Sequence, residues 1–496
     1  MSVPIRAAAH TATVASVPVD TRHWIGGARV ASGGWFADHS PVDGSLLAEV
    51  ARGGALEAEA AVAAAGAAFP GWAATSRDER AAVLHRVADG VERRLAELAN
   101  VETWDNGALL RSHLRGVMPR VVHNFRFFAD RLTELAHADF DTREHTNHVS
   151  WDPAGPCVLI TPWNAPLMLA TWKVAPALAA GNTVILKPAE WSPLTASLLA
   201  DIAAEAGLPP GVLNVVQGYG EEIGAALVAH PGVRRISFTG SVPTARRIAA
   251  AASTNLVPTS FELGGKSPLL VFADADLDLA VDLAVEQYDN AGQVCLAGTR
   301  LLVESSVAAE FTDRFVARAS TLRQGDPRDA ATDVGPSIHP DHVARVDGFV
   351  RRAIADGAEA VLGGGPNTDL GGLYYRPTLL TGLRPGAEAL TEEIFGPVLT
   401  LQTFDSEDEA VDLANSTRFG LAAVVATGDR RRADRVTGRL VAGTVWVNCF
   451  FVRDLRAPFG GSRQSGIGRE GGDWSFDFYC DLKNTVTAPK GWRTHG

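Results

Sequence analysis

Residues 183–216, TVILKPAEWSPLTASLLADIAAEAGLPPGVLNVV, contain two short apolar runs separated by one helical segment. Ser192 followed by Pro193 is typical of a helix start, whereas Gly207 followed by Pro209 is typical of a helix end. Two apolar strands joined by one helix form a βαβ unit, in which the strands lie parallel in one sheet. This stretch therefore predicts a doubly wound α/β fold.

The same alternation continues on both sides of this stretch. Short apolar runs also lie at 157–160, 236–238, 268–272 and 301–303. The helical spacing of apolar residues predicts helices near 56–68, 78–101 and 277–288. The sequence therefore predicts a Rossmann-type parallel sheet over roughly 155–260 and a second α/β region that follows it. Ligands of such sheets bind at the carboxyl ends of the strands.

Length and composition narrow the class of protein. The 496 residues exceed what a single hydrophobic core usually holds, so two or three domains are expected. With 46% hydrophobic and 21% charged residues, the composition is that of a globular protein. The 57 acidic residues outnumber the 45 Lys and Arg, and the formal charge of −12 argues against a nucleic-acid-binding protein.

The cysteines and the apolar segments indicate the compartment. The cysteines are Cys157, Cys295, Cys449 and Cys480. Their spacing matches neither a metal site nor a CxxC pair, so we expect no metal and a reducing compartment. The first twenty residues lack the core of a signal peptide and are expected to form a disordered tail. Residues 166–186 are apolar but contain Lys173, so we expect no membrane span and a cytoplasmic location.

Two residues are candidates for covalent and acid–base chemistry. Cys295 follows a Gly-containing loop, whose backbone N–H groups can lower a thiol pKa and bind an oxyanion. A small buried structural thiol is the alternative. Glu262 lies between apolar residues and a Gly-Gly turn, where burial raises a carboxyl pKa into the range of a general base. A salt-bridged structural glutamate is the alternative there.

Two segments have the chemistry of a nucleotide site. Lys187 and Glu190 come directly after an apolar strand, where such side chains can bond the two hydroxyls of a ribose. Gly240 and Ser241 also follow a strand, and a helix is predicted to open at Pro243. The free N–H groups and the dipole of this helix start favour a pyrophosphate.

Seven segments resemble the motifs of the aldehyde dehydrogenase superfamily, over nearly the whole chain from about Trp24 to Lys490. They are TPWN at 161–164, KPAE at 187–190, FTGS at 238–241, ELGGK at 262–266, GQVC at 292–295, EEIFGP at 392–397 and PFGG at 458–461. One motif alone is modest evidence, but seven in family order are highly specific. The resemblance implies a Rossmann-type cofactor domain, an α/β catalytic domain and a small β oligomerisation arm.

The resemblance also implies where these parts begin and end. The expected division is 1–138 and 159–260 for the NAD-binding domain, 261–477 for the catalytic domain, and 139–158 with 478–496 for the arm. Such arms build dimers or tetramers, so a homo-oligomer is expected.

Five residues receive catalytic roles from the resemblance. Cys295 would add to the aldehyde carbon, giving a thiohemiacetal and, after hydride transfer, a thioester. The Asn164 amide and the Cys295 N–H would bind the oxyanion, and Glu262 would activate the water that hydrolyses the thioester. Lys173 and Glu470 match family positions that support proton movement near that base.

The resemblance implies NAD as the cofactor. Lys187 and Glu190 would hold the adenosine ribose, and the Glu190 carboxylate would repel the 2′-phosphate of NADP. The other cofactor residues would be Trp163, Gly240 and Ser241 near the pyrophosphate, and Glu393 with Phe395 at the nicotinamide ribose and ring.

The segment 448–461 resembles the branch that acts on 2-hydroxymuconic, 2-aminomuconic and carboxymethyl-hydroxymuconic semialdehydes. Arg120 and Arg453 match positions that line the substrate tunnel, where many relatives have apolar residues. A guanidinium there can pair bidentately with a substrate carboxylate remote from the aldehyde. The alternative is that both are ordinary surface charges, with Asp454 as a salt-bridge neighbour.

Three other functions stay open at this point. One is a betaine or neutral aliphatic aldehyde dehydrogenase, although a cationic substrate favours an aromatic or acidic cage over two arginines. Another is an acylating, CoA-dependent enzyme, which has no need of Glu262. The last is a non-catalytic NAD-binding structural protein, which has no need of Cys295, Glu262 and Asn164 together.

Overall fold

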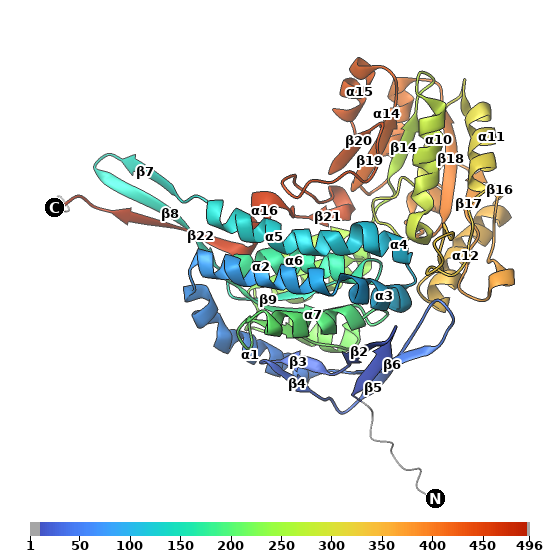
Figure 1. Cartoon of the computed structure of the whole chain (residues 1–496). Helices are drawn as coiled ribbons and strands as arrows, with labels where there is room; N and C mark the ends of the chain where they lie inside the picture. The colour runs from blue at the N-terminus through green and yellow to red at the C-terminus, as the bar shows by residue number, and fades with distance from the viewer. Residues whose placement is uncertain (1–9, 494–496) are drawn as a thin grey trace, which may run out of the picture.

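The computed structural model describes residues 10–493 (Figure 1). An eight-stranded and a seven-stranded sheet each carry helices, and a three-stranded sheet extends away from the body of the molecule (Figure 1). Two two-stranded sheets complete the strand pairing. This arrangement confirms the predicted α/β fold.

The eight-stranded sheet has the order β21-β13-β12-β9-β10-β11-β3-β4. Its strands are β3 (His23–Ile25), β4 (Ala28–Val30), β9 (Pro156–Ile160), β10 (Thr183–Lys187), β11 (Leu213–Val215), β12 (Arg235–Gly240), β13 (Thr259–Leu263) and β21 (Gly466–Ile467). The five strands from β13 to β11 are parallel. Strand order reverses between β9 and β12, and ligands of such sheets bind outside the carboxyl ends of the strands at the reversal.

Helices of the first half of the chain cover this sheet. They are α1 (Ala55–Ala74), α2 (Arg77–Arg93), α3 (Leu95–Asn106), α4 (Leu110–Ser112), η1 (His113–Val117), α5 (Met118–Glu134), α6 (Pro166–Ala179), α7 (Leu194–Glu205), η2 (Gly220–Gly224), α8 (Ala225–Val228) and α9 (Val242–Ser253). Every residue of β9 and β10 is buried, as expected for parallel strands covered on both faces.

Two predicted helices differ from the observed ones at their ends. The helix predicted over 78–101 is two helices, α2 and α3, because Arg94 leaves the helical region at φ −105° and ψ 15°. The helix predicted to start after Ser192 begins at Leu194, with Pro193 as its N-cap. Helix ends are set by local capping geometry, which sequence patterns locate only to within a residue or two.

The seven-stranded sheet has the order β16-β17-β18-β15-β14-β19-β20. Its strands are β14 (Pro268–Val271), β15 (Arg300–Glu304), β16 (Glu359–Leu362), β17 (Thr378–Thr381), β18 (Val398–Phe404), β19 (Ala422–Ala426) and β20 (Thr444–Val447). All neighbours pair in parallel except β16 with β17. The helical segments of this half are α10 (Leu277–Val285), η3 (Glu286–Gly292), α11 (Ala308–Ala319), α12 (Pro340–Ala355), η4 (Thr368–Leu370), α13 (Glu388–Thr391), α14 (Glu407–Asn415), α15 (Arg430–Thr437), η5 (Arg463–Ser465) and α16 (Gly472–Tyr479).

The three-stranded sheet joins segments from opposite ends of the chain. Strands β7 (Ala138–Thr142) and β8 (His145–Pro153) form a hairpin, and β22 (Cys480–Thr487) pairs antiparallel with β8 over its whole length. All five residues of β7 and all but the first of β22 are exposed. Figure 1 shows this sheet as the extension from which the C-terminus leaves.

The N-terminal region corrects one expectation. Residues 1–9 lie outside the described residues, but the rest of the predicted disordered tail is ordered as β1 (Thr11–Val14) and β2 (Val17–Asp20). Val14, Val17 and Val19 pack into the hydrophobic core, so their burial outweighs the interruptions by proline and aspartate. A second hairpin, β5 (Trp35–His39) and β6 (Leu46–Ala51), follows.

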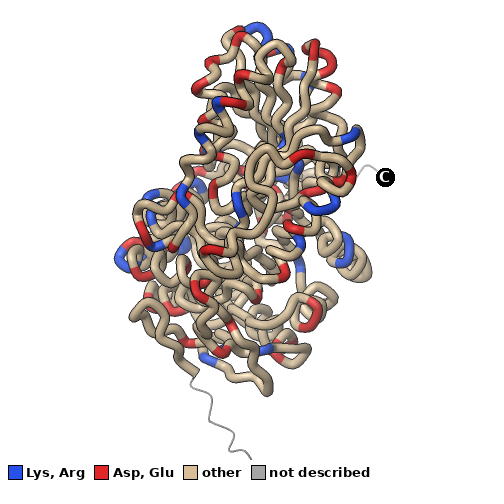
Figure 2. The backbone as a smooth tube through the Cα atoms, turned by 90° about the vertical axis from the view of Figure 1, so that its right-hand side faces the viewer, with Lys and Arg blue, Asp and Glu red and all other residues tan. Residues whose placement is uncertain are grey.

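Two observations concern the surface. In the view of Figure 2, basic and acidic residues are interspersed along the chain. Many of them pair, as Arg435 does with Glu407 at 2.8 Å. Within residues 10–493, none of the helices has both the length and the apolar character needed to cross a lipid bilayer.

Candidate active site

A cavity of about 770 Å³ lies at the carboxyl ends of the parallel strands of the eight-stranded sheet. Residues that follow β9, β12 and β13 line one side of it, on both sides of the strand-order reversal. Residues from η1, α5 and α6, from the segment 289–296 and from several later segments between 342 and 470 line other parts of it. The cavity is therefore where the parallel-sheet rule places a ligand.

Cys295 lines this cavity as a free thiol after an unusual stretch of backbone. Asn290, Ala291 and Gly292 have φ values of 49°, 54° and 71°, all in the left-handed region. A Cβ at Gly292 would lie 2.2 Å from the Gly396 carbonyl oxygen, so only glycine fits there. This turn carries the chain away from η3 and places Cys295 against the cavity.

The pKa of the Cys295 thiol differs from the sequence-based expectation. Burial, with smaller contributions from the Glu393 and Glu262 carboxyls, raises this pKa to about 12, although Arg453 acts in the opposite direction. The backbone N–H lowers the pKa, as the sequence indicated, but the net shift is upward. Desolvation of the thiolate outweighs the backbone hydrogen bond.

Asn164 is held against the segment that carries Cys295. Its side-chain Nδ2 donates to the Gln293 carbonyl oxygen at 2.9 Å, and Asn290 Nδ2 donates to the Asn164 carbonyl oxygen at 3.1 Å. Gln293 is fixed in turn, because its Oε1 accepts from the Ile338 N–H at 3.0 Å. An amide has two N–H donors, and the second one of Asn164 is left for another acceptor.

Glu262 is a buried carboxyl group whose oxygens lack hydrogen-bond partners within residues 10–493. Its exposed fraction is 4%. Burial and the nearby Glu470 carboxyl raise its pKa well above the usual value, as the sequence indicated. A Cβ at Gly460 would lie 2.8 Å from Glu262 Oε1, so this glycine makes room for the carboxyl group.

Lys173, Ser237 and Glu470 form a buried hydrogen-bonded group next to Glu262. Lys173 Nζ donates to Glu470 Oε1 at 2.6 Å and to Ser237 Oγ at 2.8 Å, and Ser237 Oγ donates to Glu470 Oε1 at 3.1 Å. Glu470 lines the cavity, whereas Lys173 does not and reaches it through Glu470. The second Glu470 oxygen has no partner among the described residues, so it can accept a proton or a water.

The residues with nucleotide-binding chemistry follow β10 and β12, and the part of the cavity that Gly240 and Ser241 line is called the cofactor end. Lys187 Nζ donates to Glu190 Oε2 at 2.9 Å, and neither residue lines the cavity itself. Ser241 is the N-cap of α9, and its Oγ accepts from the Thr244 N–H at 3.4 Å. Ser241 lines the cavity together with Gly240, so the N-terminus of α9 opens onto it.

Glu393 and Phe395 form the wall between this end and Cys295. Glu393 Oε1 accepts from the Gly265 N–H at 3.0 Å, and burial raises the Glu393 pKa to about 7. Gly264 packs so tightly on Glu393 that a Cβ there would lie 1.9 Å from its Oε2. The Phe395 ring meets the Trp163 ring edge to face, with centroids 5.3 Å apart.

The two arginines line the opposite end of the cavity. Within residues 10–493, neither Arg120 nor Arg453 has a hydrogen bond or an ion pair with a carboxylate. The surface salt bridge considered as the alternative is absent for Arg453, because Asp454 pairs with Arg456 at 2.6 Å. Burial and, to a smaller extent, repulsion by Arg120 lower the pKa of Arg453 to about 10, while the nearby Glu262 and Glu470 carboxyls act in the opposite direction.

Most of the residues singled out from the sequence meet in this one cavity. Those that line it are Arg120, Trp163, Asn164, Gly240, Ser241, Glu262, Cys295, Glu393, Phe395, Arg453 and Glu470. Sequence reasoning missed Trp172, Phe459 and Arg345, which also line it. Trp172 is a buried apolar residue with no pattern to separate it from the core, whereas Phe459 lies in the PFGG motif at 458–461, which could have marked it. Within the described residues, no group of three His, Cys, Asp or Glu side chains could hold a metal ion.

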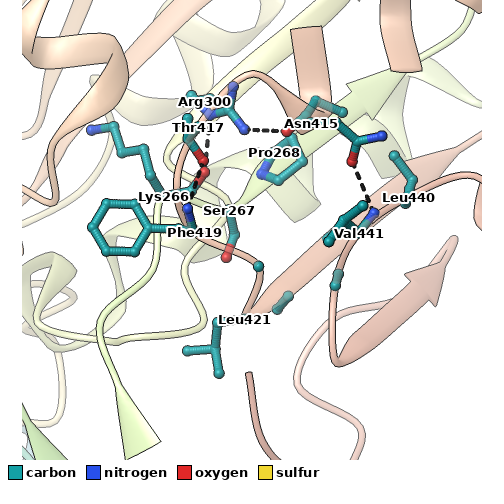
Figure 3. Close-up of a pocket in the computed structure, with 15 residues that line it drawn as sticks. Lys266, Ser267, Pro268, Arg300, Asn415, Thr417, Phe419, Leu421, Leu440 and Val441 are labelled. Atoms are coloured by element: carbon teal, nitrogen blue, oxygen red, sulfur yellow. Dashed lines mark hydrogen bonds between the residues drawn. The ribbon is translucent and has the colours of Figure 1, made fainter. Parts of the chain in front are cut away.

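A second cavity, of about 10 Å³, has room for about one water (Figure 3). Arg300 beside it donates to the carbonyl oxygens of Lys266 at 2.9 Å and Ala414 at 2.6 Å. These bonds tie the segment after β13 to the seven-stranded sheet. They therefore fix Gly264 and Gly265, against which Glu393 rests.

Comparison with known proteins agrees with this geometry. Residues 30–485 match the model of the aldehyde dehydrogenase family. The chain belongs to that family.

Several relatives of this aldehyde dehydrogenase cover almost its whole length. A 2-hydroxymuconic semialdehyde dehydrogenase of Pseudomonas sp. (strain CF600) is 47% identical over 94% of this chain and 99% of its own. A 5-carboxymethyl-2-hydroxymuconate semialdehyde dehydrogenase of Escherichia coli is 44% identical over 91% of this chain and 98% of its own. The crystal structure of an indole-3-acetaldehyde dehydrogenase complexed with NAD+ superimposes on this chain with a TM-score of 0.93. The two sequences are 40% identical, and the match covers 95% of this chain and 97% of that one.

Proposed function

We propose that this aldehyde dehydrogenase uses NAD to oxidise a semialdehyde that carries a carboxylate, of the muconic semialdehyde type. One observation carries the proposal: two half-buried guanidinium groups line the same cavity as Cys295, and neither has a hydrogen bond or an ion pair with a carboxylate among the described residues. An arginine whose N–H donors face a cavity can bind an anionic group there, so an anionic substrate group is the natural complement. The 41–47% identity to muconic semialdehyde dehydrogenases supports the same substrate class.

The residues at the cofactor end fit NAD. The N-terminus of α9 at Ser241 offers backbone N–H groups for a pyrophosphate, and Lys187 with Glu190 can bond ribose hydroxyls. Glu393 accepts from the Gly265 N–H, and its carboxyl group would hold a second ribose. NAD bound in this way supplies the hydride acceptor for the reaction.

The residues around Cys295 support nucleophilic catalysis. The Cys295 sulfur adds to the aldehyde carbon, and the free N–H of the Asn164 amide meets the oxygen that becomes negative. Loss of hydride from this adduct leaves a thioester on Cys295. Because the pKa of the thiol is raised to about 12, its proton must leave as the bond forms, and the buried Glu262 carboxylate is the base at hand.

Glu262 then acts on water. As a carboxylate it takes a proton from a water molecule, which attacks the thioester carbon and releases the carboxylate product and the thiol. The Lys173–Glu470 pair next to it provides an acceptor through which that proton can leave. The overall change converts aldehyde, NAD and water into carboxylate, NADH and two protons.

The test is NADH formation by the purified protein with three aldehydes: 2-hydroxymuconic semialdehyde, betaine aldehyde and a neutral aliphatic aldehyde. We expect kcat/KM for the acidic compound to exceed the other two by roughly a hundredfold, the size of discrimination when a buried polar site lacks its partner. A flat profile, or a preference for betaine aldehyde, would refute the carboxylate-bearing substrate.

The remaining alternatives have separate signatures. An acylating enzyme would need CoA for turnover, whereas we expect NADH formation without CoA. A protein that binds NAD without catalysis would show no turnover that iodoacetamide abolishes. The unpartnered carboxyl group of Glu262 next to Cys295 favours the hydrolytic enzyme, because an acylating enzyme has no water to activate.

We also propose that the chain assembles through the sheet of β7, β8 and β22. Phe140, Leu482 and Val486 on this sheet are exposed apolar residues, with exposed fractions of 51%, 58% and 56%. Exposed apolar side chains on strands with free edges favour pairing with another copy. Light scattering should give the mass of a dimer or tetramer, and a monomer would contradict this proposal.

A further inference from the structure

Trp172 forms the wall of the cavity against which both arginines lie. It is on α6, with an exposed fraction of 5%. The Arg453 guanidinium carbon lies 5.1 Å from the centre of the Trp172 ring, and that of Arg120 lies 5.8 Å from it. Both distances are within the range of a cation–π interaction, so one indole ring is in contact with two cations.

A second ring adds to this wall. The Phe459 ring centre is 3.8 Å from the Arg453 guanidinium carbon. Phe459 meets Trp172 nearly at a right angle, with ring centres 6.3 Å apart and an interplanar angle of 87°. Arg453 therefore lies against two aromatic rings, whereas Arg120 has only the indole.

Two cations in one cavity repel each other, and this repulsion is strong where water is excluded. The positive charge of Arg120 acts with burial to lower the pKa of Arg453. Within residues 10–493 neither arginine has a hydrogen bond or an ion pair with a carboxylate, but the negative charge of Asp454 favours the charged form of Arg120, and those of Glu262 and Glu470 favour that of Arg453. The electron-rich faces of the aromatic rings add to these charges and are in direct contact with the guanidinium groups.

We propose that Trp172 is a positioning residue that holds Arg120 and Arg453 side by side, so that both guanidinium groups meet one carboxylate of the substrate. The inference rests on the proposed function, because it concerns how the acidic substrate is selected. It assigns the selectivity to three residues and not to the arginines alone. Without the indole, the two cations would separate toward solvent and the paired site would be lost.

A merely structural role for Trp172 makes a different prediction. Phe128 is fully buried and packs edge to face on Trp172, with ring centres 6.4 Å apart, but it has no cation–π contact with either arginine. Loss of packing alone would affect Phe128→Leu and Trp172→Leu alike. Phe128→Leu is therefore the matched control.

The experiment measures kcat and KM for 2-hydroxymuconic semialdehyde and for a neutral aliphatic aldehyde in the wild type, Trp172→Leu, Trp172→Phe and Phe128→Leu. We expect Trp172→Leu to reduce the ratio of the two kcat/KM values about tenfold, mainly through KM for the acidic compound, as expected for two cation–π contacts. Trp172→Phe keeps a weaker aromatic face and should give an intermediate ratio. Phe128→Leu should leave the ratio unchanged.

The outcomes separate this inference from the proposed function. If the wild type itself does not prefer the acidic aldehyde, the proposed function fails. If the wild type prefers it and Trp172→Leu keeps the full preference, or loses it no more than Phe128→Leu does, only the positioning role is overturned. Should Trp172→Leu fail to fold, the ratio in Trp172→Phe decides alone, and an unchanged ratio there overturns the inference.

Product inhibition provides a readout that does not depend on turnover of the acidic aldehyde. The dicarboxylate product should compete for the arginines while the neutral aldehyde serves as substrate. We expect its inhibition constant to rise about tenfold in Trp172→Leu and to stay unchanged in Phe128→Leu. An equal inhibition constant in the wild type and Trp172→Leu would contradict the positioning role.

Discussion

The charged groups at the cofactor end of the cavity have hydrogen-bond partners within the chain, whereas those at the substrate end have no carboxylate ion pair among the described residues. At the cofactor end, Lys187 bonds Glu190, and Glu393 accepts from the Gly265 N–H, so each group has a partner within the chain. At the substrate end, Arg120 and Arg453 lie on aromatic rings, and no carboxylate of residues 10–493 pairs with them.

This difference separates two kinds of preorganisation. A group that is satisfied within the protein keeps its position without a ligand, which suits a cofactor that must bind in the same way in every turnover. A half-buried cation that is not ion-paired within the chain is left for an anion from outside, so under the proposed function much of the selectivity between aldehydes depends on it. The four predictions below test the contrast, from the largest expected effect to the smallest.

Cys295, which lies between the two ends of the cavity, should be the nucleophile. Cys295→Ala should reduce NADH formation by roughly 10⁴-fold or more, because the covalent route is lost. NAD affinity should change little, since the groups of the cofactor end keep their bonds. Turnover and calorimetric titration with NAD measure the two effects, and turnover within tenfold of the wild type would exclude Cys295 as the nucleophile.

The substrate end should show the largest selective effect. Arg453→Ala should lower kcat/KM for 2-hydroxymuconic semialdehyde by about a hundredfold, the loss expected when one side of a buried charge pair is removed. For a neutral aldehyde the change should stay within about threefold. Arg456→Ala is the control, because Arg456 is exposed and bonds Asp454 at the surface. Equal losses on both aldehydes would show that Arg453 has no part in selectivity.

The pH dependence of thioester hydrolysis should change when the charged neighbour of Glu262 is removed. Glu470→Gln removes a negative charge next to Glu262 and leaves Lys173 without its carboxylate, and both changes favour the ionised form of Glu262. The pKa of Glu262 should therefore fall, and the acid limb of thioester hydrolysis should move about one pH unit lower. Single-turnover hydrolysis from pH 5 to 9 measures it, and a shift to higher pH would contradict the assignment.

The cofactor end should give the smallest change. Glu190→Ala should raise KM for NAD about tenfold, as a lost ribose hydrogen bond to a charged group implies, and leave kcat unaltered. Because the carboxylate that repels a 2′-phosphate is gone, the preference for NAD over NADP should weaken. Initial rates with both cofactors measure it; an unchanged KM would place Glu190 outside the cofactor contacts.

Much of the fold could be predicted because its strands are continuous apolar runs. The runs at 157–160 and 183–186 are buried on both faces, so burial alone identifies them. The pair β1–β2 was not predicted, since Pro18 and Asp20 interrupt β2 and the buried valines Val14, Val17 and Val19 are few. Short strands of this kind depend on the surface they pack against, which no local pattern reveals.

Some residues of the site could also be predicted from the sequence, and others could not. Cys295 and Glu262 could be singled out from the residues themselves, because reactive or charged residues are unusual next to apolar and Gly-rich segments. The two arginines were singled out through the family resemblance. Trp172 was not, because an aromatic residue in an apolar helix has the same pattern whether it fills a core or holds cations. The net upward shift of the Cys295 pKa was not predicted, since desolvation depends on the residues packed around the thiol and not on its loop alone.

One short backbone link gives the site a property that matters for protein engineering. Phe459 and Glu470 share two backbone hydrogen bonds of 2.7 Å, in which the N–H of each residue donates to the carbonyl oxygen of the other. These bonds connect Phe459, whose ring contacts Arg453, to Glu470, whose carboxyl group neighbours Glu262. Retargeting the enzyme by changing residue 459 would therefore also disturb its hydrolytic step. Libraries for new aldehydes should vary Arg120 and Arg453 and keep Phe459 constant, so that the substrate changes and the turnover machinery does not.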